Sequence, residues 1–169
     1  MKRKSLAFYF ITLTVFCQGL PVGAISIEQE NAIVDHCESI KDSLKTVQKN
    51  DSRTRVYLGG YYEMILSKFI MPLNVKMVES SSPSAAALVE NQNNFAVTKT
   101  TFANDFVSYQ KELEDLIASN CKTEPVKFYD ELVAVRQKRK VVSNDVVKIR
   151  NLINEHIKLV SGLIAEMQK

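Results

Sequence analysis

The chain has 169 residues, and its formal net charge of +3 comes from 22 Lys and Arg against 19 Asp and Glu. Residues 1–24 hold three of the basic residues and none of the acidic ones, so 22 minus 3 leaves 19 basic against 19 acidic residues in the remainder. A neutral domain gives no general reason to expect nucleic acid or an anionic membrane as a partner.

Residues 1–24 have the pattern of a secretory signal peptide. Lys2, Arg3 and Lys4 precede an apolar run that ends near residue 16, and small residues lead up to Ala24. The run is shorter than the roughly 20 residues of a membrane span, so we expect cleavage between Ala24 and Ile25. The sequence therefore predicts one exported helical domain, residues 25–169, outside the cell or in its envelope.

Cys37 and Cys121 are the two cysteines that remain after residue 24. Thiols of exported proteins pair and stay paired, so we expect a disulfide between them. A zinc or redox site has little support, because the chain contains no Cys-x-x-Cys and His36 is the one ligand type beside Cys37.

The first predicted helix covers residues 27–78. Ser26 and Gln29 have the spacing of a capping box at its start. Gly59 and Gly60 would each cost roughly 1 kcal/mol in a helix interior, a cost that we expect the close approach of another helix to offset. Pro72 should kink the helix near its end. Its heptad seam consists of Ile33, Cys37, Ile40, Leu44, Val47, Asp51, Thr54, Leu58, Tyr61 and Ile65, with Phe69 and Leu73 slightly out of step.

A reversal of the chain within residues 51–60 is the alternative, and it would give a four-helix bundle. The disulfide favours the continuous helix. Position 79, midway between Cys37 and Cys121, lies beside the Ser-Pro turn at residues 80–83, so two antiparallel helices leaving that turn bring both cysteines to the same height. We therefore expect an elongated antiparallel three-helix bundle of the all-α class, with coiled-coil-like heptad seams.

The second predicted helix covers residues 83–120 and the third covers residues 124–168. Thr123, Glu124 and Pro125 form a good start for the third helix. The basic run at residues 136–140 is more typical of a solvated helix face than of a binding patch. The second seam consists of Leu88, Gln92, Phe95, Lys99, Phe102, Phe106, Tyr109, Leu113 and Leu116, and the third of Phe128, Leu132, Val135, Arg139, Val142, Val146, Ile149, Ile153, His156, Val160, Leu163 and Met167.

Polar residues on these seams should form layers across the bundle. In the three-helix register Asp51 lies at nearly the same height as Arg139, and Gln92 at nearly the same height as His156. Such layers align helices at some cost in stability, and we favour this role over catalysis.

Motifs for phosphate binding, zinc proteolysis and serine hydrolysis are absent from the sequence. With two histidines and a paired set of cysteines, the usual bases and nucleophiles are scarce, so we expect no enzyme, no cofactor and no metal. Two functions remain open. One is a structural or protein-binding role, including self-association; the alternative is a carrier or membrane-active bundle that holds lipid among the aromatic seam residues.

Three segments, residues 55–59 (RVYLG), 91–95 (NQNNF) and 102–106 (FANDF), together resemble uncharacterised secreted helical proteins of ultrasmall, host-attached bacteria. The resemblance would cover most of the chain after residue 24. It implies an exported, coiled-coil-like protein and brings no activity or functional residues with it.

Overall fold

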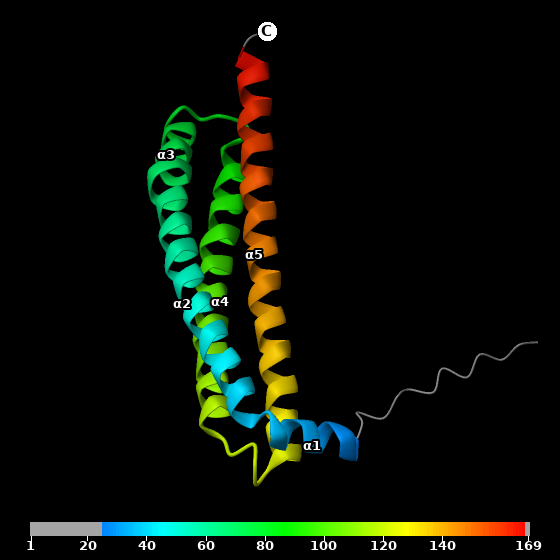
Figure 1. Ribbon diagram of the computed structural model, residues 1–169. Helices are drawn as coiled ribbons and strands as arrows, with labels where there is room; N and C mark the ends of the chain where they lie inside the picture. Colours follow the sequence, from blue (N-terminus) through cyan, green and yellow to red (C-terminus); the bar gives the residue numbers. More distant parts are fainter. Residues whose placement is uncertain (1–24, 168–169) are drawn as a thin grey trace, which may run out of the picture.

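The computed structural model describes residues 25–167, with side chains placed as far as Ala165. Every regular element in this part is a helix and none is a strand, so the predicted all-α class is confirmed. The predicted signal peptide, with Ala24, lies outside the described residues. Figure 1 shows the long helices running antiparallel to one another, with a short helix across one end. The elements are α1 (Ile27–Asp35), α2 (Cys37–Ile65), η1 (Leu66–Ile70), α3 (Met71–Glu79), α4 (Ala85–Ala118) and α5 (Pro125–Met167).

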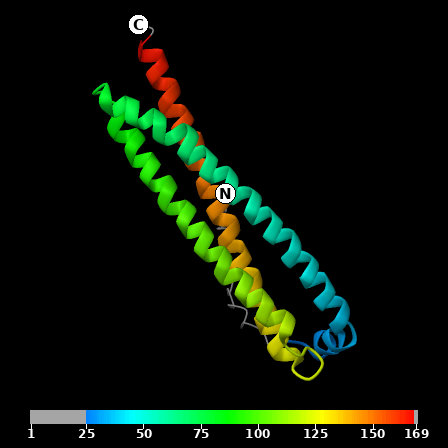
Figure 2. The ribbon, with the colours of Figure 1, turned by 90° about the vertical axis from the view of Figure 1, so that its left-hand side faces the viewer.

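The first rod consists of α2, the π-helical turn η1 and α3, which follow one another without a reversal. Figure 2 shows this rod unbroken from α1 to the hairpin that leads into α4. No described glycine has a positive φ, so Gly59 and Gly60 do not form a turn. The alternative of a four-helix bundle broken within residues 51–60 is therefore wrong. The bounds predicted for the second and third helices agree with α4 and α5 within two residues.

A break that the sequence analysis did not expect separates α1 from α2. It falls at His36, whose φ of −106° and ψ of 14° leave helical geometry. The prediction of one helix over residues 27–78 is wrong at this point. After the break α1 lies across the end of the bundle, where it contacts α5 and buries Ile33 (Figure 1). A straight continuation would carry Ile33 past the end of the core and leave that end open to water.

The start of α1 has the predicted capping box. Ser26 Oγ accepts the backbone N–H of Gln29 at 3.2 Å, and Gln29 Oε1 accepts the backbone N–H of Ser26 at 3.1 Å. Ile25, the residue after the predicted cleavage site, already packs against the core. The first residue expected in the mature chain thus contributes to the packing of the described domain.

Gly59 and Gly60 lie in the middle of α2, and no other helix approaches them closely. A β-carbon added at either position would meet no heavy atom within 4 Å. The expectation that the missing side chains allow close packing is therefore wrong. Each glycine weakens the helix by roughly 1 kcal/mol without a compensating contact.

The turn η1 lies directly before Pro72, where the sequence analysis expected a kink. Proline lacks an N–H, and its ring crowds the carbonyl four residues earlier, here that of Lys68 within η1. A π-turn rotates the following side chains about the helix axis relative to an α-helix. Tyr61, which the predicted seam placed in the core, is exposed although it precedes the π-turn, and Phe69, slightly out of step with that seam, is exposed within the turn. The residues that are buried on this rod instead follow each other at steps of four: Tyr62, Leu66, Ile70 and Asn74.

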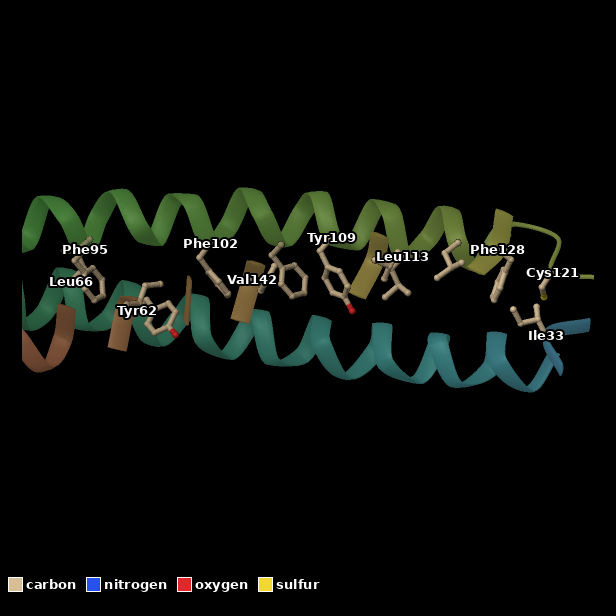
Figure 3. Packing of buried hydrophobic residues seen from close by; sticks show 14 of the residues in the cluster. Ile33, Tyr62, Leu66, Phe95, Phe102, Tyr109, Leu113, Cys121, Phe128 and Val142 are labelled. Carbon is tan, nitrogen blue, oxygen red and sulfur yellow. The ribbon is translucent and has the colours of Figure 1, made fainter. Parts of the chain in front are cut away.

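The helix α4 is central, because both the first rod and α5 pack against it far more closely than they pack against each other. Its buried residues follow the predicted second seam. Figure 3 shows them between α4 and α2, with Tyr62 placed between Phe95 and Phe102 and making edge-to-face contacts with both rings. The buried residues that α4 contributes to the main core cluster are Phe95, Phe102, Phe106, Tyr109, Leu113 and Leu116.

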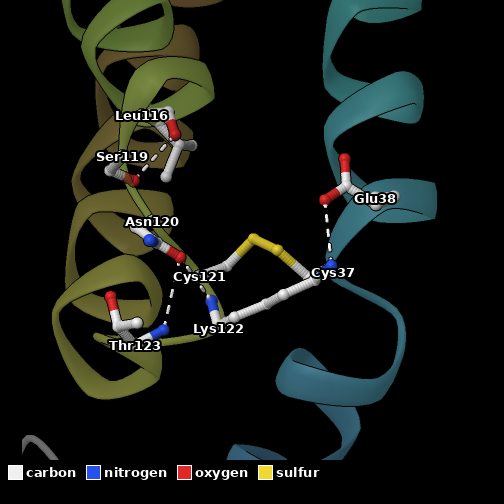
Figure 4. Close-up of a disulfide and its surroundings, with 8 residues drawn as sticks. All are labelled: Cys37, Glu38, Leu116, Ser119, Asn120, Cys121, Lys122 and Thr123. Atoms are coloured by element: carbon white, nitrogen blue, oxygen red, sulfur yellow. Dashed lines mark hydrogen bonds and ion pairs between the residues drawn. A yellow bond between two sulfur atoms is a disulfide. The ribbon is translucent and has the colours of Figure 1, made fainter.

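Cys37 and Cys121 form the predicted disulfide, with 5.7 Å between their α-carbons and 84 residues of sequence separation. Both cysteines are buried. Figure 4 shows the bond joining the start of α2 to the loop after α4, with an ion pair of 3.3 Å between Glu38 and Lys122 beside it. The chain-entropy model assigns roughly 4 to 5 kcal/mol to a crosslink over such a loop.

Candidate functional site

The first of the two predicted polar layers is present, because its two side chains bind each other. Arg139 donates to both carboxylate oxygens of Asp51, from Nε at 2.7 Å and from one terminal nitrogen at 2.9 Å. The hydroxyl of Tyr109 donates to the same carboxylate at 2.7 Å. Burial, with the hydrogen bond to Asp51 second, raises the pKa of Tyr109. The layer connects α2, α4 and α5 at one height.

The second predicted layer does not form, because no hydrogen bond connects Gln92 with His156 among the described residues. Gln92 Oε1 accepts a hydrogen bond of 2.9 Å from Asn74 Nδ2, whereas His156 is 8% exposed and neither ring nitrogen has a hydrogen-bond partner among the described residues. Burial lowers the pKa of His156. The imidazole is therefore held neutral at pH 7, with its polar atoms unsatisfied.

Two buried asparagines near the hairpin were missed by the sequence analysis. Asn74 Nδ2 donates to the carbonyl of Leu88 at 2.9 Å, and Asn91 Nδ2 donates to the carbonyl of Leu152 at 3.2 Å. The amide oxygens of both asparagines lack partners among the described residues. Asn91 directly precedes Gln92, so a polar layer at this height was signalled, but Asn74 is brought inward by the π-turn.

A buried acid, Asp145, was also missed. It is 1% exposed and accepts a hydrogen bond of 3.0 Å from Lys148. Burial, followed by a hydrogen bond with Asp145, raises the pKa of the neighbouring Asp105. The described residues contain no group of three or more His, Cys, Asp or Glu that would hold a metal ion.

Two hollows lie between the first rod and α5. The central hollow, about 520 Å³, has an apolar floor and a largely cationic rim. The hairpin-end hollow, about 490 Å³, is mainly apolar. The central hollow is lined by Asp51, Thr54, Arg55, Leu58, Phe102, Phe106, Tyr109, Arg136, Arg139, Lys140, Val142, Ser143 and Val146; the hairpin-end hollow is lined by Lys68, Phe69, Pro72, Leu73, Lys76, His156, Ile157, Val160 and Ser161.

The basic residues of the run at 136–140 have different surroundings: some form ion pairs and others line the central hollow. Arg139 pairs with Asp51, and Lys138 contacts Glu112 at 3.3 Å. Arg136 and Lys140 line the central hollow, opposite Arg55, whose guanidinium lies 5.5 Å from the centroid of the Phe106 ring. Arg136 and Lys140 are exposed, as the solvated-face interpretation expects, and they also contribute charge to a hollow.

The hollows contain parts of the predicted first seam. Leu58 of that seam lines the central hollow, and Phe69 and Leu73, which lie slightly out of step with it, line the hairpin-end hollow. Leu58 and Leu73 are partly buried, whereas Phe69 is 62% exposed. No helix of the described chain covers the Phe69 side chain.

Among the described residues, no helix is long and apolar enough to cross a membrane. Comparison of the chain with protein-family models, curated proteins and solved structures gives no match. The resemblance to secreted helical proteins of ultrasmall bacteria thus stays an expectation from the sequence. The geometry between the first rod and α5 is the remaining guide to function.

Proposed function

We propose that this chain is a non-enzymatic, exported helical protein that binds a helical segment of a partner along the side of the bundle between the first rod and α5. The observation that carries the proposal is the uncovered part of the first seam. Phe69, which lies slightly out of step with the heptad pattern, is 62% exposed, and a heptad pattern is the signature of packing against another helix.

The two hollows fit such a partner in shape. Helix-in-groove recognition places apolar side chains, spaced one or two helical turns apart, into hollows between two helices. Arg55 and Pro72, one from each lining, are 17 residues apart along the first rod, or roughly 25 Å at 1.5 Å per residue. A partner helix of about 20 residues would reach both hollows and complete a four-helix arrangement.

Export is supported by the signal-peptide pattern and by the disulfide, because disulfides persist in oxidising compartments. The crosslink also supports a binding rather than a reactive role for the two cysteines, since a bonded sulfur is neither a nucleophile nor a metal ligand. These observations support a rod that presents a surface outside the cell or in its envelope.

Site-specific photo-crosslinking in the native source tests the proposal. A photoreactive residue in place of Phe69 should crosslink to one protein partner, whereas the same residue in place of Val107 should not. Val107 is a matched control, because it is 57% exposed on α4 and lines neither hollow. Equal crosslinking at the two positions would contradict a partner site in the hollows.

A lipid or apolar-ligand carrier is the second candidate function, favoured by the Phe102 and Phe106 rings on the floor of the central hollow. A carrier would bury the ligand among these rings. Native mass spectrometry of the protein purified from its source distinguishes the two candidates. Lipid that copurifies would support the carrier, and a stoichiometric protein partner would support the helix-binding function.

A further inference from the structure

We infer that the segment bound in the two hollows is an acidic amphipathic helix, whose apolar side chains fill the hollows and whose carboxylates meet the cations around them. The inference rests on the proposed function, because it names the chemistry of the partner at the same site. The observation that supports the inference is that the side chains lining both hollows carry mainly positive charge.

The central hollow holds an excess of cations. Asp51 is its one acidic lining residue, and this carboxylate is already engaged by Arg139 and Tyr109. Arg55, Arg136 and Lys140 have no salt-bridge partner among the described side chains, so three positive charges surround an apolar floor. A carboxylate placed here gains charge-assisted hydrogen bonds, whereas a cation would be repelled.

The hairpin-end hollow repeats this arrangement. Lys68 and Lys76 line it, no acidic residue does, and neither lysine is ion-paired within the described part of the chain. His156, nine-tenths buried in the same lining, has two ring nitrogens without hydrogen-bond partners among the described residues. A carboxylate that accepts the imidazole N–H would satisfy one of these atoms.

The occupant we favour is a helix rather than a lipid, because the two hollows are separate and open. A pocket for a small apolar ligand encloses 70–90% of the surface of that ligand, while these hollows open to solvent on one side of the bundle. Between them Ile65 and Ile153 pack against the core. A partner helix that lies across both hollows would contact each of them, whereas a single acyl chain would fill one of them.

Fluorescence anisotropy with synthetic peptides tests the inference. The first probe is a 24-residue amphipathic helix with leucine at the a and d positions and glutamate on both flanks of that stripe. The second has lysine in place of every glutamate. We expect the acidic peptide to bind the full exported domain at least about tenfold more tightly than the basic one, and to weaken as salt is raised.

Paired charge variants locate the effect. Arg136→Gln with Lys140→Gln, and separately Lys68→Gln with Lys76→Gln, should each weaken binding of the acidic peptide about five- to tenfold, because each pair removes two charges near the partner. The matched control is Lys45→Gln with Lys49→Gln, two exposed cations of α2 that line neither hollow. The control pair should leave the affinity unchanged.

The possible failures are distinguishable. If both peptides bind equally well and Phe69→Ala weakens both, the hollows bind helices and the inference about charge is overturned. If neither peptide binds while oleate does, with Phe106→Ala weakening oleate, the helix-binding function itself is overturned in favour of the carrier. Equal weakening by the control pair would show a non-specific charge effect and would also overturn the inference.

Discussion

The two ends of the bundle differ in how their interiors are built. At the disulfide end, α1 closes a contiguous core of aromatic and aliphatic side chains, and the partly buried Asp51 pairs with the exposed Arg139. At the hairpin end, beyond Ile70, the buried positions include Asn74, Asn91 and His156, each with at least one unsatisfied polar atom in the described structure.

This difference indicates a division of roles along the rod. Buried apolar surface and a crosslink stabilise the disulfide end. Gln110 and Glu131 also bury one unsatisfied polar atom each there, so the two ends differ in degree: at the hairpin end the fully buried positions themselves include two asparagines and a histidine with unsatisfied atoms. Regions of low local stability are where proteins place segments that rearrange on binding. The hairpin-end hollow lies in the weaker region, and the central hollow lies where the two regions meet.

Removal of the disulfide should have the largest effect, because it weakens the stronger end. Cys37→Ala with Cys121→Ala should lower the free energy of unfolding by roughly 4 to 5 kcal/mol, measured by chemical denaturation. Hydrogen exchange should show the greatest loss of protection in α1 and at the start of α2. A loss of protection confined to the hairpin end would contradict the proposed division.

Truncation of a core aromatic near the middle of the rod, where the aromatic core meets the hairpin-end region, is expected to rank next. Phe102→Ala leaves a cavity beneath Tyr62 and should cost about 3 to 5 kcal/mol. Leu163→Ala, near the far end of α5, is the comparison variant, and its buried side chain lies outside the main core cluster. A smaller loss of unfolding free energy for Leu163→Ala than for Phe102→Ala would support the difference between the two regions, and an equal loss would contradict it.

Protonation of His156 should weaken the hairpin end. Its pKa is lower in the folded chain than in the unfolded chain, so the unfolded state binds more protons between the two values. Stability is therefore full above about pH 6.5 and falls as the pH drops through the folded value. Glu155 on α5, and Lys68 and Lys76 on the first rod, are the nearby charged groups.

His156→Leu is the variant that isolates this dependence. It removes the titrating group and two unsatisfied atoms, so we expect a gain of about 1 to 3 kcal/mol and a flatter pH dependence of unfolding between pH 7 and pH 5. The control is His36→Gln, at an exposed histidine on the other end of the molecule. An unchanged pH dependence in His156→Leu would show that His156 does not cause the effect.

Replacement of the glycines should have the smallest effect, and it should be stabilising. Gly59→Ala or Gly60→Ala should each raise the free energy of unfolding by about 1 kcal/mol, because the added methyl group meets no atom within 4 Å. Thermal unfolding measures this gain. A loss of stability would mean that another helix approaches α2 more closely than the structure shows.

Much of the fold follows from local pattern. The apolar seam residues of α4 and α5 whose side chains are described are buried or partly buried as predicted, because each helix packs against neighbours along one stripe. The polar Arg139 of the third seam is exposed. The pairing of Cys37 with Cys121 follows from their equal distance to the hairpin. The contact of Asp51 with Arg139 follows from the same register, since helices joined by a short turn have fixed relative heights.

Two departures from the predicted helical pattern are visible only in the tertiary structure. The break at His36 depends on an open core end that α1 has to cover, and the exposure of Phe69 depends on the π-turn together with the position of α5. The spacing of apolar residues predicts neither feature. It defines the apolar face of a helix, but it does not determine whether another helix packs against that face. The sequence by itself determined the helices, their order and their crosslink, whereas packing in three dimensions decided which seam stayed open.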